Sequence, residues 1–183
     1  DWLTDRKTEC PYDVTLNGRR YRVHGTLIRG EGTMSNMLGV MYFSDMTELY
    51  QIRDEYIRSR PVVSIILVDN YEELTKSLPE STISNLQADI NDVITGWAER
   101  YHGILRKLEK NRYLLVFEKR DLPATLEDKF SVLDRVREVT NPAGLGATLS
   151  IGLGLEGESF EESYNCAALS FEEAVEAGTC VDC

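Results

Sequence analysis

Hydrophobic residues in the first 45 positions predict three strands, at residues 12–16, 19–28 and 38–44, which we expect to pair antiparallel. In the second, the period of two places Tyr21, Val23 and Leu27 on one face. Asn17-Gly18, between the first two, is a strong hairpin signal because both residues tolerate the positive φ angles of a tight turn. A sheet of three such strands leaves one face without a cover unless other elements supply it.

A different pattern begins at Asp45 and predicts a helix. Small polar and acidic residues at 45–48 are typical of a helix start. Leu49, Ile52 and Tyr56 then follow at spacings of three and four residues. This apolar stripe is narrow, as in the seam between two paired helices, and Pro61 ends the helix. We therefore expect residues 47–60 to be a linker helix that joins two copies of the chain in a homodimer.

From Pro61 onward the pattern is that of a second domain. Residues 62–68 form a near-continuous apolar run, which is typical of a buried central strand. The later elements are expected in the following order: a helix at 80–101, strands at 103–108 and 112–118, a helix at 124–139, a strand at 147–155, a helix at 159–177 and a short strand in 179–183. The order β-α-β-β-α-β-α is that of the ferredoxin-like, split βαβ plan.

Charge and composition narrow the class of protein. The 183 residues include 20 Lys or Arg and 31 Asp or Glu, for a net charge of −11, and all of the acidic excess lies after residue 60. A hydrophobic content of 42% suffices for a folded core, and the acidic balance argues against a nucleic-acid binder. No apolar run approaches the roughly 18–20 residues of a membrane span. Because the first residue is Asp1, we expect the chain to be a cytoplasmic segment of a longer protein.

Several motifs of the second domain resemble a known family. The apolar strand followed by Asp69, the hairpin near the middle and Thr-Leu-Ser-Ile-Gly at 148–152 resemble the GGDEF domain of diguanylate cyclases. The resemblance implies an α+β, ferredoxin-like βαββαβ nucleotide-cyclase fold. Upstream, Tyr-Phe-Ser-Asp-Met-Thr-Glu at 42–48 resembles the end of a PAS sensor domain.

The combination of these parts resembles the GdpP-like cyclic di-AMP phosphodiesterases, a resemblance that residues 68–74, 91–98 and 136–140 also carry. It implies three parts: the C-terminal part of a PAS-like domain in 1–46, the linker helix in 47–60 and a degenerate GGDEF domain in 61–183. In that family two membrane helices precede the PAS domain, and a DHH/DHHA1 phosphodiesterase follows the GGDEF domain. The resemblance therefore implies a protein anchored in the bacterial plasma membrane, with the membrane contact outside this segment.

Most residues that a diguanylate cyclase needs are replaced. The family's first strand ends in Asp-x-Asp; its metal-binding first Asp falls on Leu67, and only the second remains, as Asp69. The signature Gly-Gly-Asp-Glu-Phe falls on Glu-Lys-Asn-Arg-Tyr at 109–113, so both glycines and both acids are missing. Of the inhibitory Arg-x-x-Asp motif, Arg100 remains and Gly103 stands in place of the Asp. The resemblance implies a domain without cyclase activity and without the usual inhibition by cyclic di-GMP.

The resemblance also allows a nucleotide ligand at the cleft where diguanylate cyclases bind GTP. GdpP-like GGDEF domains are credited with weak ATP hydrolysis, so the resemblance allows ATP with Mg²⁺. The residues best placed to bind it are Asp69, Asn70, Glu109, Asn111 and Arg112. The alternative is that Asp69 caps the following turn and Glu109 is a solvated hairpin acid. No residue is assigned as catalytic or as a metal ligand.

The histidines and cysteines have simpler structural explanations. His24 invites a haem assignment because GdpP-like PAS domains are associated with haem, but its strand phase places it on an exposed face with basic residues. Haem is expected only in the complete PAS domain of the longer protein. His102 lies at a helix end, where a cation is favourable. Cys180 and Cys183 have CxxC spacing without the second pair that a zinc site needs.

Three functions agree with the sequence. The first, which we favour, is a regulatory segment of a cyclic di-AMP phosphodiesterase, in which a sensor, a dimer helix and a degenerate cyclase domain tune a downstream hydrolase. The second is a residual NTPase at the cleft near Asp69 and Asn111. The third is a structural dimerisation spacer.

Overall fold

The computed structural model describes residues 2, 3, 5, 7–29, 37–155, 157, 159–177, 181 and 182. The chain divides into two compact units, Asp1–Ile57 and Arg58–Cys183. Most of the loop expected at 29–37 lies outside the described residues. Within the described part, no helix combines the length and the apolar character needed to cross a membrane.

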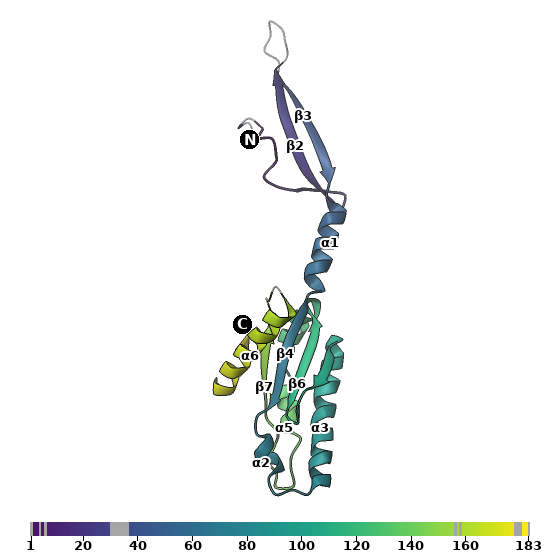
Figure 1. The fold of residues 1–183 in the computed structure, drawn as a ribbon. Coiled ribbons are helices and arrows are strands. Elements are labelled where there is room, and N and C mark those ends of the chain that lie inside the picture. The colour runs from purple at the N-terminus through teal and green to yellow at the C-terminus, as the bar shows by residue number, and fades with distance from the viewer. Residues whose placement is uncertain are drawn as a thin grey trace. The chain divides into compact units, whose positions relative to one another are not determined.

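The first unit contains a three-stranded antiparallel sheet. Its strands lie in the order β1 (Val14–Leu16), β2 (Arg19–Arg29) and β3 (Met37–Asp45). Figure 1 shows the long pair formed by β2 and β3. Asn17 and Gly18 have φ angles of 49° and 77°. Positive φ at both central residues is the signature of the two-residue hairpin turn that matches strand twist. The three strands and the Asn17-Gly18 hairpin are therefore confirmed.

The sheet of the first unit carries apolar side chains on both faces. On one face the ring of His24 stacks on Tyr42, with centroids 4.8 Å apart, so His24 is half-buried and the expectation of an exposed histidine is wrong. On the other face Trp2 and Leu3 lie against Gly25. A Cβ at Gly25 would lie 3.0 Å from the indole, so a larger residue here would require the indole to shift by a few tenths of an ångström.

Helix α1 (Thr47–Arg58) follows the sheet and begins where the sequence predicts. The Thr47 amide donates to Oδ1 of Asp45 at 3.0 Å, which satisfies a free donor of the first turn. None of the residues of α1 is buried. Leu49, Ile52 and Tyr56 are 57%, 61% and 67% exposed, so the predicted stripe faces solvent in the single chain.

The second unit is built on a five-stranded sheet of order β5-β6-β4-β7-β8. Its strands are β4 (Pro61–Val68), β5 (Ile104–Lys107), β6 (Arg112–Glu118), β7 (Leu149–Gly154) and β8 (Val181–Asp182). β7 and β8 pair in parallel and the other neighbours pair antiparallel. β4 lies in the middle and is buried over most of its length, which confirms the predicted central strand.

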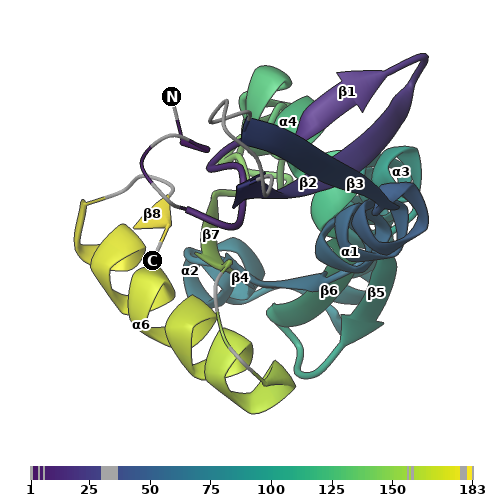
Figure 2. The same ribbon diagram turned by 90° about the horizontal axis from the view of Figure 1, so that it is seen from above.

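Helices cover both faces of this sheet. They are α2 (Tyr71–Thr75), α3 (Glu80–Ala98), α4 (Leu122–Glu127), α5 (Val132–Arg137) and α6 (Phe160–Ala177). Because side chains alternate along a strand, Val62, Ile66 and Val68 pack in one apolar cluster with α3 and α5. Val63 and Ile65 pack on the opposite face with Ala167 of α6. Figure 2 shows α3 and α6 on these two sides of the sheet. The predicted β-α-β-β-α-β-α order is confirmed, with the short helix α2 in addition.

The predicted helix at 124–139 is wrong in one respect, because it is broken into α4 and α5. Lys129 and Phe130 both have φ near 51°, which no helix interior adopts. Asp128 stabilises the break, since its carboxylate accepts hydrogen bonds from the Ser131 amide and the Trp97 indole. The break turns Phe130 into the core, where it is 7% exposed.

Helix α6 packs closely against β7. Among residues 160–170 of α6, whose side-chain burial the structure describes, those that are buried are small: Ser163, Ala167 and Ser170. A Cβ at Gly154 would lie 1.8 Å from the Ser163 carbonyl oxygen, so the close approach of the two backbones requires a glycine here. Phe160, the first residue of α6, is 51% exposed.

Candidate functional site

The five predicted nucleotide-binding residues lie at one end of the central sheet. Asp69 and Asn70 directly follow β4, and Glu109 and Asn111 lie in the turn between β5 and β6, where Arg112 begins β6. The Val68 amide donates to the Asn111 carbonyl at 2.8 Å, so the two segments are in contact. The β4–β6 register that produces this contact follows from the apolar pattern of the two strands.

A cavity of about 590 Å³ opens at this end of the sheet. It is lined by Tyr71, Glu72, Glu109, Lys110 and Asn111. Glu109 and Asn111 were predicted from the sequence; the other three were not. Tyr71 and Glu72 belong to α2, whose five residues are too short to give a clear periodic pattern. The carboxylates of Glu72 and Glu109 and the ammonium of Lys110 give the cavity a mixed charge.

Asp69 points to β7 rather than to the turn. Its amide donates to the Thr148 carbonyl at 3.0 Å. Partial burial raises the pKa of its carboxyl above the ordinary value, while hydrogen bonds with Ser150 and Thr148 act in the opposite direction. The alternative that Asp69 caps the next turn does not hold, since Asn70 occupies that position and makes no side-chain capping bond.

The Asn70 side chain is engaged within the protein. Its amide nitrogen donates to the Gly146 carbonyl at 2.8 Å and its oxygen accepts from the Thr148 amide at 3.0 Å. Both ends of the amide thus join the start of α2 to the segment that leads into β7. A ligand would have to displace one of these bonds to contact the group.

Two positions where the cyclase family carries acids face each other in the sheet. Leu67 and Arg112 are register partners on β4 and β6. Arg112 forms an ion pair with Glu109, at 3.8 Å between Nη1 and Oε1. Within the described residues there is no group of three or more His, Cys, Asp or Glu that could hold a metal ion. Asp69 and Glu109 have different partners, since Asp69 interacts with Ser150 and Thr148 and Glu109 with Arg112.

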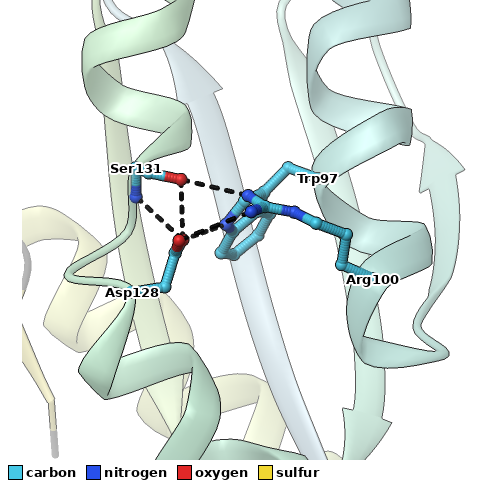
Figure 3. A network of polar contacts seen from close by, with 4 residues as sticks. All are labelled: Trp97, Arg100, Asp128 and Ser131. Atoms are coloured by element: carbon cyan, nitrogen blue, oxygen red, sulfur yellow. Dashed lines mark hydrogen bonds and ion pairs between the residues drawn. The ribbon is translucent and has the colours of Figure 1, made fainter.

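Arg100, the remnant of the inhibitory motif, is tied into an internal network (Figure 3). Its guanidinium lies 3.5 Å from Oδ1 of Asp128 and donates to the Ser131 hydroxyl at 3.0 Å. The Trp97 indole donates to Oδ2 of the same carboxylate at 2.9 Å. Burial alone would raise the pKa of Asp128, but hydrogen bonds from Ser131 and Trp97 outweigh it and lower this pKa to about 2. The sequence gives no signal for Asp128 as the partner, because it lies 28 residues from Arg100.

The remaining candidates have ordinary structural surroundings. His102 is the C-terminal cap of a 3-10 turn (Glu99–Tyr101) and lies 3.9 Å from Asp121, which agrees with its predicted place at a helix end. Cys10 is a free thiol and Cys166 is disulfide-bonded. The Cys180 and Cys183 side chains lie outside what the structure describes. A second cavity, of about 520 Å³, lies at the opposite end of the sheet, next to Pro61, Ile104 and Phe117.

Comparisons with known proteins agree with this picture. A model of the family described as cyclic-di-AMP phosphodiesterase GdpP-like, GGDEF domain, matches residues 66–178. The chain is 33% identical to cyclic-di-AMP phosphodiesterase GdpP of Bacillus subtilis, over 90% of this chain and 24% of that protein. It is 27% identical to cyclic-di-AMP phosphodiesterase PdeA of Listeria monocytogenes, over 76% of this chain and 21% of that protein. The chain thus spans about a quarter or less of the length of these curated relatives.

Solved structures confirm the fold. The active GGEEF domain of a Vibrio cholerae diguanylate cyclase is similar with a TM-score of 0.58 at 13% identity, over 73% of this chain and 89% of that one. The GGDEF domain of FimX from Pseudomonas aeruginosa gives 0.58 at 15% identity, over 74% and 91%. At such identities the likeness concerns the fold alone. The α+β nucleotide-cyclase fold expected from the sequence is therefore confirmed, with the three-stranded sheet preceding it.

Proposed function

The chain belongs to the GGDEF-domain family of GdpP-like cyclic-di-AMP phosphodiesterases, and from this membership we propose that it is a regulatory segment of such an enzyme. The homologous phosphodiesterases are about four times as long as the matched segment. We assign the hydrolysis of cyclic di-AMP to another part of the longer protein, and the control of its rate to this segment.

One observation carries the proposal: Leu67 and Arg112, which replace two acids of the cyclase family, face each other as register partners on β4 and β6. Neither a leucine nor a guanidinium can ligate a hard cation. The fold is thus retained while the chemistry that it supports in cyclases is removed. A domain of this kind serves regulation more readily than catalysis, and we propose that it makes no cyclic di-GMP.

The other parts of the chain have roles in the same proposal. We propose that the first sheet is the end of a PAS sensor domain, with any haem held by that domain's remainder, and that the longer protein is anchored in the plasma membrane. The exposed stripe of α1 pairs two copies and transmits the sensor state. A small nucleotide binds at the β5–β6 turn as a second signal.

A residual NTPase is the second candidate, because Asp69 and Glu109 lie at the same end of the sheet. In that function Mg²⁺ bound by these carboxylates would assist ATP hydrolysis. Asp69→Ala should then abolish phosphate release, and unchanged release would exclude this site as its source.

The test of the regulatory proposal uses the full-length protein that carries the segment. We expect Leu49→Asp, on the stripe of α1, to change the rate of cyclic di-AMP hydrolysis by at least about fivefold, a usual size for coupling between sites. Gln51→Asp adds the same charge on the opposite side of α1 and should leave the rate unchanged. Equal rates in both variants and the natural protein would contradict regulation through α1. The formation of cyclic di-GMP from GTP and Mg²⁺ by the natural protein would contradict the loss of cyclase activity.

A further inference from the structure

The side chain of Tyr50 connects helix α1 to the sheet of the first unit. Tyr50 lies in the first turn of α1 and is half-buried, although no residue of α1 is fully buried. Its hydroxyl donates to a carboxylate oxygen of Asp13, the residue directly before β1. Arg22 of β2 donates from Nη2 to the same hydroxyl at 3.4 Å. One phenol of the helix is therefore bonded to two neighbouring segments of the sheet.

The ring of Tyr50 has a second partner on β2. The Arg20 guanidinium lies over it, with 4.9 Å between Cζ and the ring centroid, which is within the range of a cation–π contact. Arg20 and Arg22 are two residues apart, so their side chains lie on the same face of the sheet. The backbone of Arg20 also bonds to the start of α1, since its carbonyl accepts from the Met46 amide at 2.8 Å and its amide donates to the Thr47 hydroxyl at 2.9 Å. The ring and the hydroxyl of Tyr50 are thus held from one face of β2.

The charged groups around the Tyr50 hydroxyl are paired with one another. Arg22 Nε lies 3.7 Å from the Asp13 carboxylate and 3.3 Å from that of Glu9, which itself forms an antiparallel bridge with His24 of β2. The Arg22 and Asp13 side chains are 39% and 31% exposed, so both are partly shielded from solvent. Hydrogen bonds with charged partners are stronger than bonds between neutral groups. The hydroxyl therefore meets a charged donor and a charged acceptor that the sheet already holds in place.

The place of Tyr50 on the helix determines where the apolar stripe of α1 faces. Tyr50 follows Leu49 by one residue, which places its side chain roughly 100° further around the helix. Ile52 and Tyr56 lie near Leu49 on the helix surface, because they follow at spacings of three and four residues. The stripe and Tyr50 therefore lie on different sides of α1. A rotation of α1 that turned the stripe would break the bonds of Tyr50, and a shift of Asp13 or Arg22 would turn the stripe.

We propose that Tyr50 is a positioning residue, whose bonds to Asp13 and Arg22 transmit the arrangement of the first sheet to the direction in which the stripe of α1 faces. The inference rests on the regulatory function proposed above, in which α1 carries the state of the sensor. It names the contact through which the sheet and the helix are coupled. Tyr50 acts on the rate of the enzyme only through the orientation of α1.

The first measurement is the hydrogen exchange of the α1 amides in the 183-residue chain, by mass spectrometry of peptides that cover the helix. A helix of 12 residues is marginal by itself, so its protection depends on its attachment. Tyr50→Phe keeps the ring under Arg20 and removes the hydroxyl, and we expect exchange in α1 to become about fivefold faster. Asp13→Ala should have a similar effect, and the double variant should exchange no faster than either one, because both changes remove the same bond. Tyr12→Phe is the matched control, since it removes a hydroxyl from a side chain that is 77% exposed and should leave exchange unchanged.

The second measurement is the rate of cyclic di-AMP hydrolysis by the full-length protein that carries the segment. We expect Tyr50→Phe and Asp13→Ala to change this rate in the same direction by at least about threefold, less than the usual coupling between sites because one contact of several is removed. The double variant should equal either single variant, and Tyr12→Phe should equal the natural protein. Circular dichroism establishes that the variants compared are folded, so a changed rate per folded enzyme reports coupling, which a merely structural role of Tyr50 would not alter.

Three results would overturn the inference. Unchanged exchange in Tyr50→Phe would mean that the hydroxyl does not hold α1, and multiplied effects in the double variant would mean that Tyr50 and Asp13 act separately. An unchanged rate of hydrolysis in Tyr50→Phe, while Leu49→Asp changes it, would remove Tyr50 from a regulatory function that still stands. If neither variant changes the rate, the regulatory function itself fails, and coupled exchange in the double variant still supports the attachment of α1 by Tyr50. If Asp13→Ala does not fold, Arg22→Gln takes its place, because Arg22 bonds to the same hydroxyl.

Discussion

Trp97 and Asp128 join helix α3 to the break between α4 and α5, through a hydrogen bond of 2.9 Å from the indole nitrogen to a carboxylate oxygen. The indole is 1% exposed, and Asp128 also accepts from the amide and the hydroxyl of Ser131. One carboxylate therefore satisfies a buried donor of one element and fixes the backbone of another. This arrangement explains why the chain leaves the helical path here although its apolar pattern continues.

Removal of the Asp128 charge should destabilise the second unit. Asp128→Asn keeps the shape but weakens the bonds from Ser131 and Trp97, and we expect a loss of about 1–3 kcal/mol in the free energy of unfolding. Urea denaturation followed by tryptophan fluorescence measures it. Asp134→Asn is the control, because Asp134 is exposed and pairs with Arg137 on the surface of α5. An equal loss of unfolding free energy in Asp134→Asn would mean that the network around Asp128 does not stabilise the fold specifically.

The same carboxylate predicts how stability changes with acid. The pKa of Asp128 is lowered to about 2 in the folded protein, from an ordinary value of 3.8. Between these values the unfolded chain binds more protons than the folded one, so stability falls as the pH decreases from about 4 to about 2. We expect Asp128→Asn to show a smaller decrease over this window in acid titrations of unfolding. Parallel curves for the variant and the natural protein would contradict the assignment.

Most of the fold could be predicted because its signals are local. Asn17-Gly18 determines a hairpin through φ angles that two residues adopt by themselves, and the apolar run before Asp69 is recognisable without its neighbours. The break at 128–131 could not be predicted, because its cause is a bond to Trp97, which lies 31 residues earlier. A continuous apolar stripe gives no sign of such a contact.

In the candidate site, too, the features set by local sequence could be predicted, and those set by distant contacts could not. The order of strands predicts that Asp69 and the 109–112 turn meet at one end of the sheet, and the Val68–Asn111 bond is the result. The engagement of Asn70 with Gly146 and Thr148 could not be predicted, because it depends on the path of the loop before β7. The sequence predicted Asn70 as a ligand-binding residue from its type and position, whereas both ends of its side-chain amide are bonded within the protein.

Two glycines of the second unit should respond to alanine in opposite ways. Gly154→Ala would place a Cβ 1.8 Å from the Ser163 carbonyl oxygen, so α6 must move away from β7 and we expect loss of the cooperative unfolding transition. Gly96 lies inside α3 with no atom within 4 Å of an added Cβ. Gly96→Ala should stabilise the protein by about 0.5–1 kcal/mol because it limits the unfolded chain and favours helix. Thermal unfolding by circular dichroism compares the two, and a Gly154→Ala variant as stable as the natural protein would contradict the close approach.

The stripe of α1 predicts the association state of the chain. Leu49, Ile52 and Tyr56 are each more than half exposed, and burial of such a stripe between two copies removes apolar surface from water. We expect the natural segment to sediment as a dimer at high concentration in analytical ultracentrifugation. Leu49→Asp should shift it to a monomer, because two carboxylates would meet in the apolar seam. Gln51→Asp, with the same added charge on the other side of the helix, should remain dimeric; a monomeric natural segment at high concentration, or equal dissociation of both variants, would rule out this seam as the contact.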